Sequence, residues 1–120
     1  MSFRETLRDV VENVGGGMGA VIMGYDGIAI EEYIKADTPF DVQLLAVEYA
    51  TLLKEIKRTV EVLKTGEMEE IGITTGFSRA IVRVINDDFF LVLALDRDGN
   101  YGKGRYLLKR VAPKLQEELS

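Results

Sequence analysis

The side chains that most often carry enzyme chemistry at neutral pH are missing from this sequence. Its 120 residues include no histidine and no cysteine. A Ser-His-Asp or Cys-His nucleophile, an imidazole base and a zinc site built from Cys and His are therefore all excluded. Carboxylate, lysine, tyrosine and serine chemistry remain open.

Paired carboxylates are the first remaining candidates, because two acids with separated pKa values can act as general acid and general base. The chain has three adjacent acidic pairs, Glu31–Glu32, Glu69–Glu70 and Asp87–Asp88. Neighbouring side chains of a strand point to opposite faces, so such pairs do not form a dyad. We expect solvated strand edges and turns at these positions, and we predict no catalytic residue.

Ligand-binding loops are the second candidates. Asp96, Asp98 and Asn100 resemble the start of a calcium loop, but the glutamate that closes an EF-hand is missing, so we expect a turn. The glycines of Gly15–Gly19 follow a predicted helix, the reverse of the order in a phosphate-binding loop. Gly102–Arg105 has the right order but lacks the full Walker spacing and its Ser or Thr, which leaves anion binding there a minor alternative. We predict no metal ion and no cofactor.

Composition limits the remaining classes of protein. The length, 47% hydrophobic content and 29% charged content fit one folded domain over residues 1–120. A net charge of -5 and a pI near 4.8 disfavour nonspecific binding to nucleic acid. No apolar run approaches the roughly 20 residues that cross a bilayer, and Met1–Arg8 is too polar for a signal peptide. We therefore expect a cytoplasmic protein without membrane insertion.

The first third of the chain predicts a helix followed by a hairpin. Ser2, with Glu5 three residues later, is a capping box, and apolar residues follow at helical spacing up to the glycine run. β-prone residues at Met18–Met23 and Ile28–Ile34 flank Asp26–Gly27, a strong hairpin turn signal.

A long second helix is predicted next. Thr38 is a suitable N-cap and Pro39 suits the first helical position. The apolar pattern continues to about Thr65, where Gly66 ends it.

Three strands and a last helix complete the chain. The strands are predicted at Ile71–Thr75, Ala80–Ile85 and Phe89–Leu95, and the helix at Gly102–Leu119. Pro113 removes a helix hydrogen bond, so we expect a kink or restart near it. The predicted fold class is α+β, with a five-stranded antiparallel sheet flanked by three helices.

The long helix has more apolar residues than one face can bury. One stripe, expected to face the core, contains Val42, Leu45, Tyr49, Leu52, Ile56, Val60 and Leu63. Leu44 and Val47, with Leu53 as a further candidate, then need a second surface such as a dimer interface. The alternative is a wide core stripe plus a few scattered exposed apolar residues. The charged side is typical of a solvated face, and it offers Glu48, Glu55 and Arg58 as candidate contacts for a partner protein.

The order of elements, together with Ala20–Ile30, resembles the Roadblock/dynein light chain (Roadblock/LC7) family, in particular its bacterial and archaeal members of the MglB type. In that segment an apolar strand, an acidic-glycine turn and a second apolar strand follow the first helix. The resemblance spans nearly the whole chain and implies a Roadblock/profilin-like fold.

Members of this family form homodimers or heterodimers through the long helix and the third strand. Carried onto this sequence, the resemblance implies a dimer interface formed by Leu44, Val47, Thr51, Lys54, Glu69, Ile71 and Ile73. Pairing of the third strand with its twin would satisfy backbone groups at a bare sheet edge. Both a homodimer and a heterodimer with a paralogue fit this arrangement.

The resemblance also implies a Ras-like small GTPase as partner. A module of this kind would not hydrolyse GTP itself but would hold the switch loops of the GTPase. An arginine finger could come from Arg58, Arg79 or Arg105, and the sequence singles out none of them. Two other functions stay open: a dynein-light-chain-like scaffold without effect on nucleotide turnover, and a small-ligand sensory domain with an apolar cavity.

Overall fold

The computed structural model describes residues 2–120, so Met1 of the predicted domain lies outside the described residues. Its first helix, α1 (Phe3–Glu12), begins as the capping box predicts. The Ser2 hydroxyl oxygen accepts a hydrogen bond from the Glu5 backbone N–H at 3.1 Å. This bond satisfies one of the N–H groups that a helix start leaves unpaired.

Five antiparallel strands form one sheet. They are β1 (Gly17–Gly24), β2 (Ala29–Ile34), β3 (Glu70–Thr74), β4 (Ser78–Val84) and β5 (Phe89–Asp96). Their spatial order is β2-β1-β5-β4-β3, so β2 and β3 are the two edges. The predicted hairpin and the predicted three-strand meander are both confirmed.

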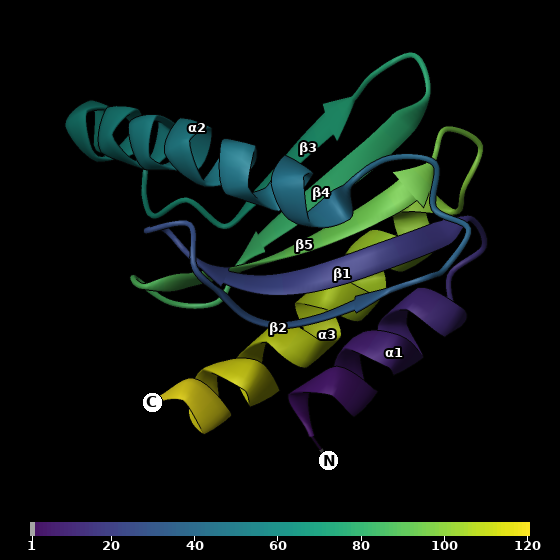
Figure 1. Cartoon of the computed structure of the whole chain (residues 1–120). Coiled ribbons are helices and arrows are strands. Elements are labelled where there is room, and N and C mark those ends of the chain that lie inside the picture. Colours follow the sequence, from purple (N-terminus) through teal and green to yellow (C-terminus); the bar gives the residue numbers. More distant parts are fainter. Residues whose placement is uncertain (1) are drawn as a thin grey trace.

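Helices cover both faces of the sheet. Figure 1 shows α2 (Val42–Leu63) on one face, and α1 beside α3 (Tyr101–Leu119) on the other. Two apolar clusters result, one under α2 around Phe90 and Leu53, and one under α1 and α3 around Leu93 and Leu108. The predicted α+β architecture and its element order are confirmed.

The start of α2 differs from the prediction. Its N-cap is Asp41, whose carboxylate oxygen accepts a hydrogen bond from the Leu44 backbone N–H at 3.0 Å. Thr38 instead donates its hydroxyl hydrogen bond to the Lys35 carbonyl at 2.7 Å, and thereby holds the chain where it leaves β2. Prolonging the helix back to Thr38 would break this loop, which leads from the β2 edge toward the helix. The predicted end is close, because Lys64 adopts the left-handed conformation that ends a helix.

The buried stripe of α2 also differs from the predicted one. The buried residues are Val42, Ala46, Ala50 and Leu53, and Leu45 and Tyr49 of the predicted stripe pack beside them, whereas Leu52 is 47% exposed and Leu63 is exposed as well. Leu53, predicted as a candidate for the second surface, is fully buried. The predicted stripe was based on the spacing of the large apolar side chains. In the structure the inner face includes two alanines, whose small side chains let α2 lie close to β1.

No restart interrupts α3 at Pro113. The helix runs through this proline to Leu119. Both Pro113 and Lys109, whose carbonyl loses its partner, are exposed, so water can take the place of the missing hydrogen bond. Within residues 2–120 no helix is long and apolar enough to cross a bilayer.

Candidate interaction surface

The outer face of α2 exposes apolar side chains. Leu44 is 55% exposed and Val47 is 36% exposed, and both were predicted to need a second surface. Thr51 and Lys54 lie further along the same helix face and are also exposed. These four predicted interface residues, spaced by three or four positions, form one continuous stripe that points away from the sheet.

Strand β3 supplies the second part of the predicted interface. It is an edge strand, paired only with β4, so one row of its backbone N–H and C=O groups has no partner strand. Ile71 and Ile73 lie on the α2 side of the sheet and are half-buried, and Ile71 packs against the cluster under α2. Glu69, just before the strand, is exposed. All seven predicted interface residues therefore lie on α2 or at the β3 edge, with side chains that are exposed or half-buried.

Ion pairs hold β3 on the side of the sheet away from α2. Glu70 accepts a hydrogen bond from Arg105 Nε at 2.9 Å and pairs with the Arg105 guanidinium at 2.8 Å. This contact with Glu70 raises the pKa of Arg105. Arg83 lies 3.9 Å from Glu69. Glu69 and Glu70 thus connect the edge strand to β4 and α3 through two different arginines.

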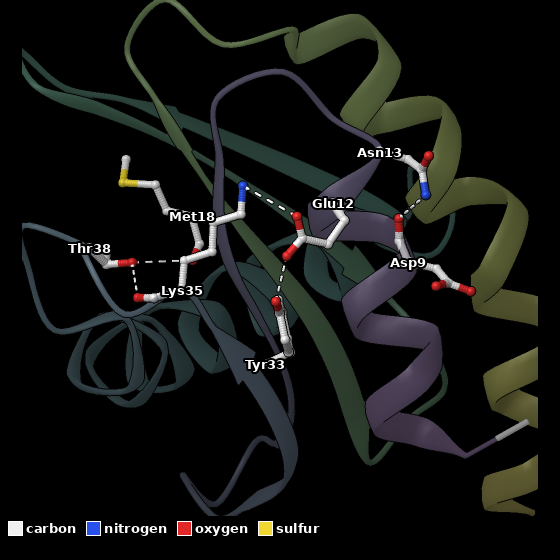
Figure 2. A network of polar contacts seen from close by, with 7 residues as sticks. All are labelled: Asp9, Glu12, Asn13, Met18, Tyr33, Lys35 and Thr38. Atoms are coloured by element: carbon white, nitrogen blue, oxygen red, sulfur yellow. Dashed lines mark hydrogen bonds and ion pairs between the residues drawn. The ribbon is translucent and has the colours of Figure 1, made fainter.

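A polar network fixes the other edge strand and the approach to α2. Figure 2 shows Glu12 of α1 accepting a hydrogen bond from the Tyr33 hydroxyl and pairing with Lys35. The bond from Tyr33 and the charge of Lys35 lower the pKa of Glu12. Beside them, the Thr38 hydroxyl lies within hydrogen-bond distance of both the Lys35 and Met18 carbonyls. These contacts set where the segment before α2 starts.

The charged candidates on α2 differ in their contacts. Glu55 and Arg58 form an i,i+3 ion pair at 3.3 Å, and Glu48 is exposed. Lys57 lies 3.7 Å from Asp87 in the β4–β5 turn. The three predicted contacts therefore remain available on the surface of α2.

The three candidate finger arginines are now distinguishable. The Arg79 guanidinium lies 3.7 Å over the ring of Tyr101, and Arg105 is tied to Glu70. Arg58 projects from α2 with its side chain 71% exposed. Of the three, Arg58 would lose the least contact energy if its side chain moved to reach a partner.

The candidate loops are structural. Asn100 caps α3 by accepting a hydrogen bond from the Lys103 backbone N–H. The carbonyls of Gly15 and Gly16 accept hydrogen bonds from Asn100 and Asp96, which joins the glycine run to the turn before α3. Gly102–Arg105 lies in the first turns of α3, in agreement with the predicted helix Gly102–Leu119, and does not form a ligand-binding loop before it. No cluster of acidic residues suited to a metal ion occurs within residues 2–120.

Several exposed apolar residues were not singled out by the sequence. Phe77, at the tip of the β3–β4 hairpin, is 90% exposed, and Val62 is exposed near the end of α2. The predicted strands leave Phe77 in the turn between them, but the exposure of its side chain depends on how far the hairpin extends past the sheet. Val62 extends the outer stripe of α2, five turns after Leu44.

Comparisons with known proteins agree with this architecture. MglC from Myxococcus xanthus is 41% identical to the chain, covers 98% of it and is itself 99% covered, with a TM-score of 0.71. A Roadblock/LC7 domain from Streptomyces avermitilis is 12% identical, with 99% of this chain and 98% of that chain covered and a TM-score of 0.85. An MglB with a tetrameric arrangement is 20% identical, with 94% and 84% covered and a TM-score of 0.82. No protein-family model and no curated protein matches the sequence.

The topology and the two flanking helix layers define an α+β domain of the Roadblock type, as the likeness to the Streptomyces domain shows. The chain belongs to the Roadblock/LC7 family, since its identity with MglC extends over nearly the whole of both chains. The resemblance stated from the sequence is thereby confirmed.

Proposed function

We propose that this chain is a single, non-catalytic Roadblock domain that forms a homodimer in the cytoplasm and binds and regulates a Ras-like small GTPase. The observation that carries the proposal is the exposed apolar stripe of α2 on the same side of the sheet as the half-buried side chains of the bare edge strand β3. Pairing two β3 strands would satisfy their free backbone groups, and the two α2 helices would cover Leu44 and Val47. One MglB is known in a tetrameric arrangement, which supports self-association in this family.

The GTPase partner follows from the family resemblance. In this proposal the paired α2 helices present Glu48, Glu55 and Arg58 to the switch loops of the GTPase. In this proposal these residues do not activate water, and the module acts by favouring one arrangement of those loops. The related MglB from Thermus thermophilus is a gliding protein, which favours a role in motility regulation.

The dimer is tested by light scattering on the purified chain at about 50 μM. We expect a dimer for the wild type and a folded monomer for Leu44→Glu and Val47→Glu, because each puts a charge into the proposed apolar contact. Tyr106→Glu is the matched control, since Tyr106 is 60% exposed on α3, on the opposite face of the sheet. A monomeric wild type would overturn the dimer.

The GTPase role is tested by single-turnover GTP hydrolysis. Ras-like GTPases of the source organism are assayed with the wild-type chain and with Arg58→Ala. A change in hydrolysis rate on adding the wild type supports regulation, and its loss in Arg58→Ala would assign Arg58 to the contact. Binding without any change in rate would instead support the scaffold.

The sensory alternative has less support. It requires an enclosed apolar cavity, and the hollow of about 460 Å³ beside Tyr25 is not one, because charged and amide side chains, among them Lys57, Glu61 and Arg83, form most of its lining. Such a lining does not suit an apolar ligand.

A further inference from the structure

The α1/α3 face of the sheet has an unusual charge distribution. The chain has 15 basic and 20 acidic residues, yet the segment 101–116 of α3 contains no acid. Its basic residues are Lys103, Arg105, Lys109, Arg110 and Lys114. A strongly basic helix in an acidic protein indicates a local preference for negative charge.

A groove runs between α1 and α3 next to this basic helix. Its volume is about 570 Å³. Val10 of α1 and Leu107 and Val111 of α3 line it with apolar side chains. Lys103 and Arg110 stand on the α3 wall, while Asp9 lies on the α1 wall. The groove is therefore apolar between its walls, cationic along α3 and acidic at one point of α1.

Two cations of this wall form no ion pair within the part of the chain that the structure describes. Lys103 and Arg110 are exposed, and neither side chain has an ion-pair partner among residues 2–120. By contrast, Arg83 and Arg105 pair with glutamates. Nothing in the fold itself requires two unpaired cations along an apolar groove.

We propose that this groove binds an acidic amphipathic helix of a partner protein. Lys103 and Arg110 are seven residues apart, which is two helical turns or about 10.5 Å along α3. A helix lying alongside α3 would place carboxylates at positions i and i+7 next to these two cations. Its leucines at i+3 and i+4 would lie on Val10, Leu107 and Val111, as in other helix-in-groove complexes.

This docking site goes beyond the proposed GTPase function. The two helices that line the groove, α1 and α3, lie on the opposite face of the sheet from α2, as Figure 1 shows. A dimer formed through α2 and β3 would leave both grooves open. The chain would then join two partners on its two faces.

The experiment uses the full chain and a fluorescein-labelled synthetic helix of 18 residues, with Glu at i and i+7 and Leu at i+3 and i+4 of each repeat. A second peptide has every Glu replaced by Lys. Fluorescence anisotropy is expected to show binding of the acidic peptide only, with an affinity that falls as NaCl rises. Lys103→Glu/Arg110→Glu is expected to weaken that binding at least tenfold. Lys64→Glu/Arg97→Glu makes the same change in charge at two exposed positions outside the groove and is expected to leave it unchanged.

Three results would overturn the proposal. The first is no binding of the acidic peptide at 100 μM chain, and the second is equal loss in both double variants. The third is co-sedimentation of the chain with phosphatidylglycerol vesicles that Lys103→Glu/Arg110→Glu abolishes while peptide binding persists, which would assign the cations to a membrane surface. Dimer formation measured on the same samples separates a failure of this site from a failure of the α2 interface.

Discussion

The guanidinium of Arg79 lies 3.7 Å over the ring of Tyr101, so the start of α3 is stacked on the start of β4. The Tyr101 hydroxyl in turn fills the space above Gly72 in β3, where an added Cβ would overlap it. One aromatic ring thus connects α3 with both strands at the edge proposed for dimer formation. The absence of a side chain at Gly72 is what permits this arrangement.

Gly72→Ala is expected to lower the free energy of unfolding by about 1–2 kcal/mol, because the new methyl group displaces Tyr101 from Arg79. Tyr101→Phe removes the overlapping oxygen and leaves the nearest ring carbon 3.2 Å from the added Cβ. The Gly72→Ala/Tyr101→Phe variant should therefore be nearly as stable as Tyr101→Phe alone in urea unfolding. An equal cost of Gly72→Ala in both backgrounds would show that the overlap is not the cause.

Leu53→Ala and Leu52→Ala test which stripe of α2 is buried. Leu53 is fully buried, so its truncation should cost about 2–5 kcal/mol of unfolding free energy. Leu52, its neighbour in sequence, is half exposed, so Leu52→Ala should lower the free energy of unfolding by less than about 1 kcal/mol. Chemical denaturation of the two variants compares them directly. If Leu52→Ala lost more unfolding free energy than Leu53→Ala, the buried stripe would be the one expected from the spacing of the large side chains.

The contrast between these leucines shows what the sequence can and cannot predict. The Asp26–Gly27 turn and the Ser2 cap were recognised because each acts through its own backbone neighbours. The inner face of α2 was not recognised from the sequence. Ala46 and Ala50 belong to it because the helix lies close to the sheet, and this distance is not visible in the sequence of the helix. The N-cap of α2 was misplaced for a similar reason, since Thr38 bonds to Met18, 20 residues away.

The candidate surfaces depend still more on distant contacts. The apolar excess on the long helix was visible in the sequence, but the edge position of β3 came from the family resemblance. The groove between α1 and α3 joins segments from the two ends of the chain, and neither segment alone indicates a binding site. Strand order and helix neighbours are set by the whole sheet, so local patterns do not contain them.

Pro113→Ala is expected to raise the free energy of unfolding by about 1–2 kcal/mol. The substitution restores an N–H that can bond to the Lys109 carbonyl and removes the clash of the ring, while the freer unfolded chain offsets part of the gain. Thermal unfolding followed by circular dichroism measures the effect. Glu117→Ala, at another exposed position of α3, controls for the change to alanine. A lower stability of Pro113→Ala would mean that the proline fixes a bend on which α3 packing depends.

The Tyr25 hydroxyl is expected to limit stability at alkaline pH. Its ring packs against Phe90 at 5.2 Å, Lys57 lies 4.9 Å from its centroid, and its oxygen has no hydrogen-bond partner among residues 2–120. Burial, with a smaller contribution from Asp87, raises the pKa of Tyr25 to about 12. The fold favours the neutral phenol, so this stabilisation is complete below the unfolded pKa near 10 and is lost as the pH rises from about 10 to about 12.

Tyr25→Phe should therefore be as stable as the wild type or up to about 1 kcal/mol more stable at pH 7, because the substitution removes an unpaired buried hydroxyl. Between pH 9 and pH 11 the wild type should lose roughly 1 kcal/mol more than Tyr25→Phe, since only the wild type must ionise this phenol on unfolding. Urea unfolding at pH 7, 9, 10 and 11 measures both effects, and Tyr106→Phe makes the same change at an exposed tyrosine. Parallel pH profiles for wild type and Tyr25→Phe would mean that water reaches the Tyr25 oxygen in the folded chain, and a hydrated hydroxyl beside Lys57 would make the hollow there open to polar ligands.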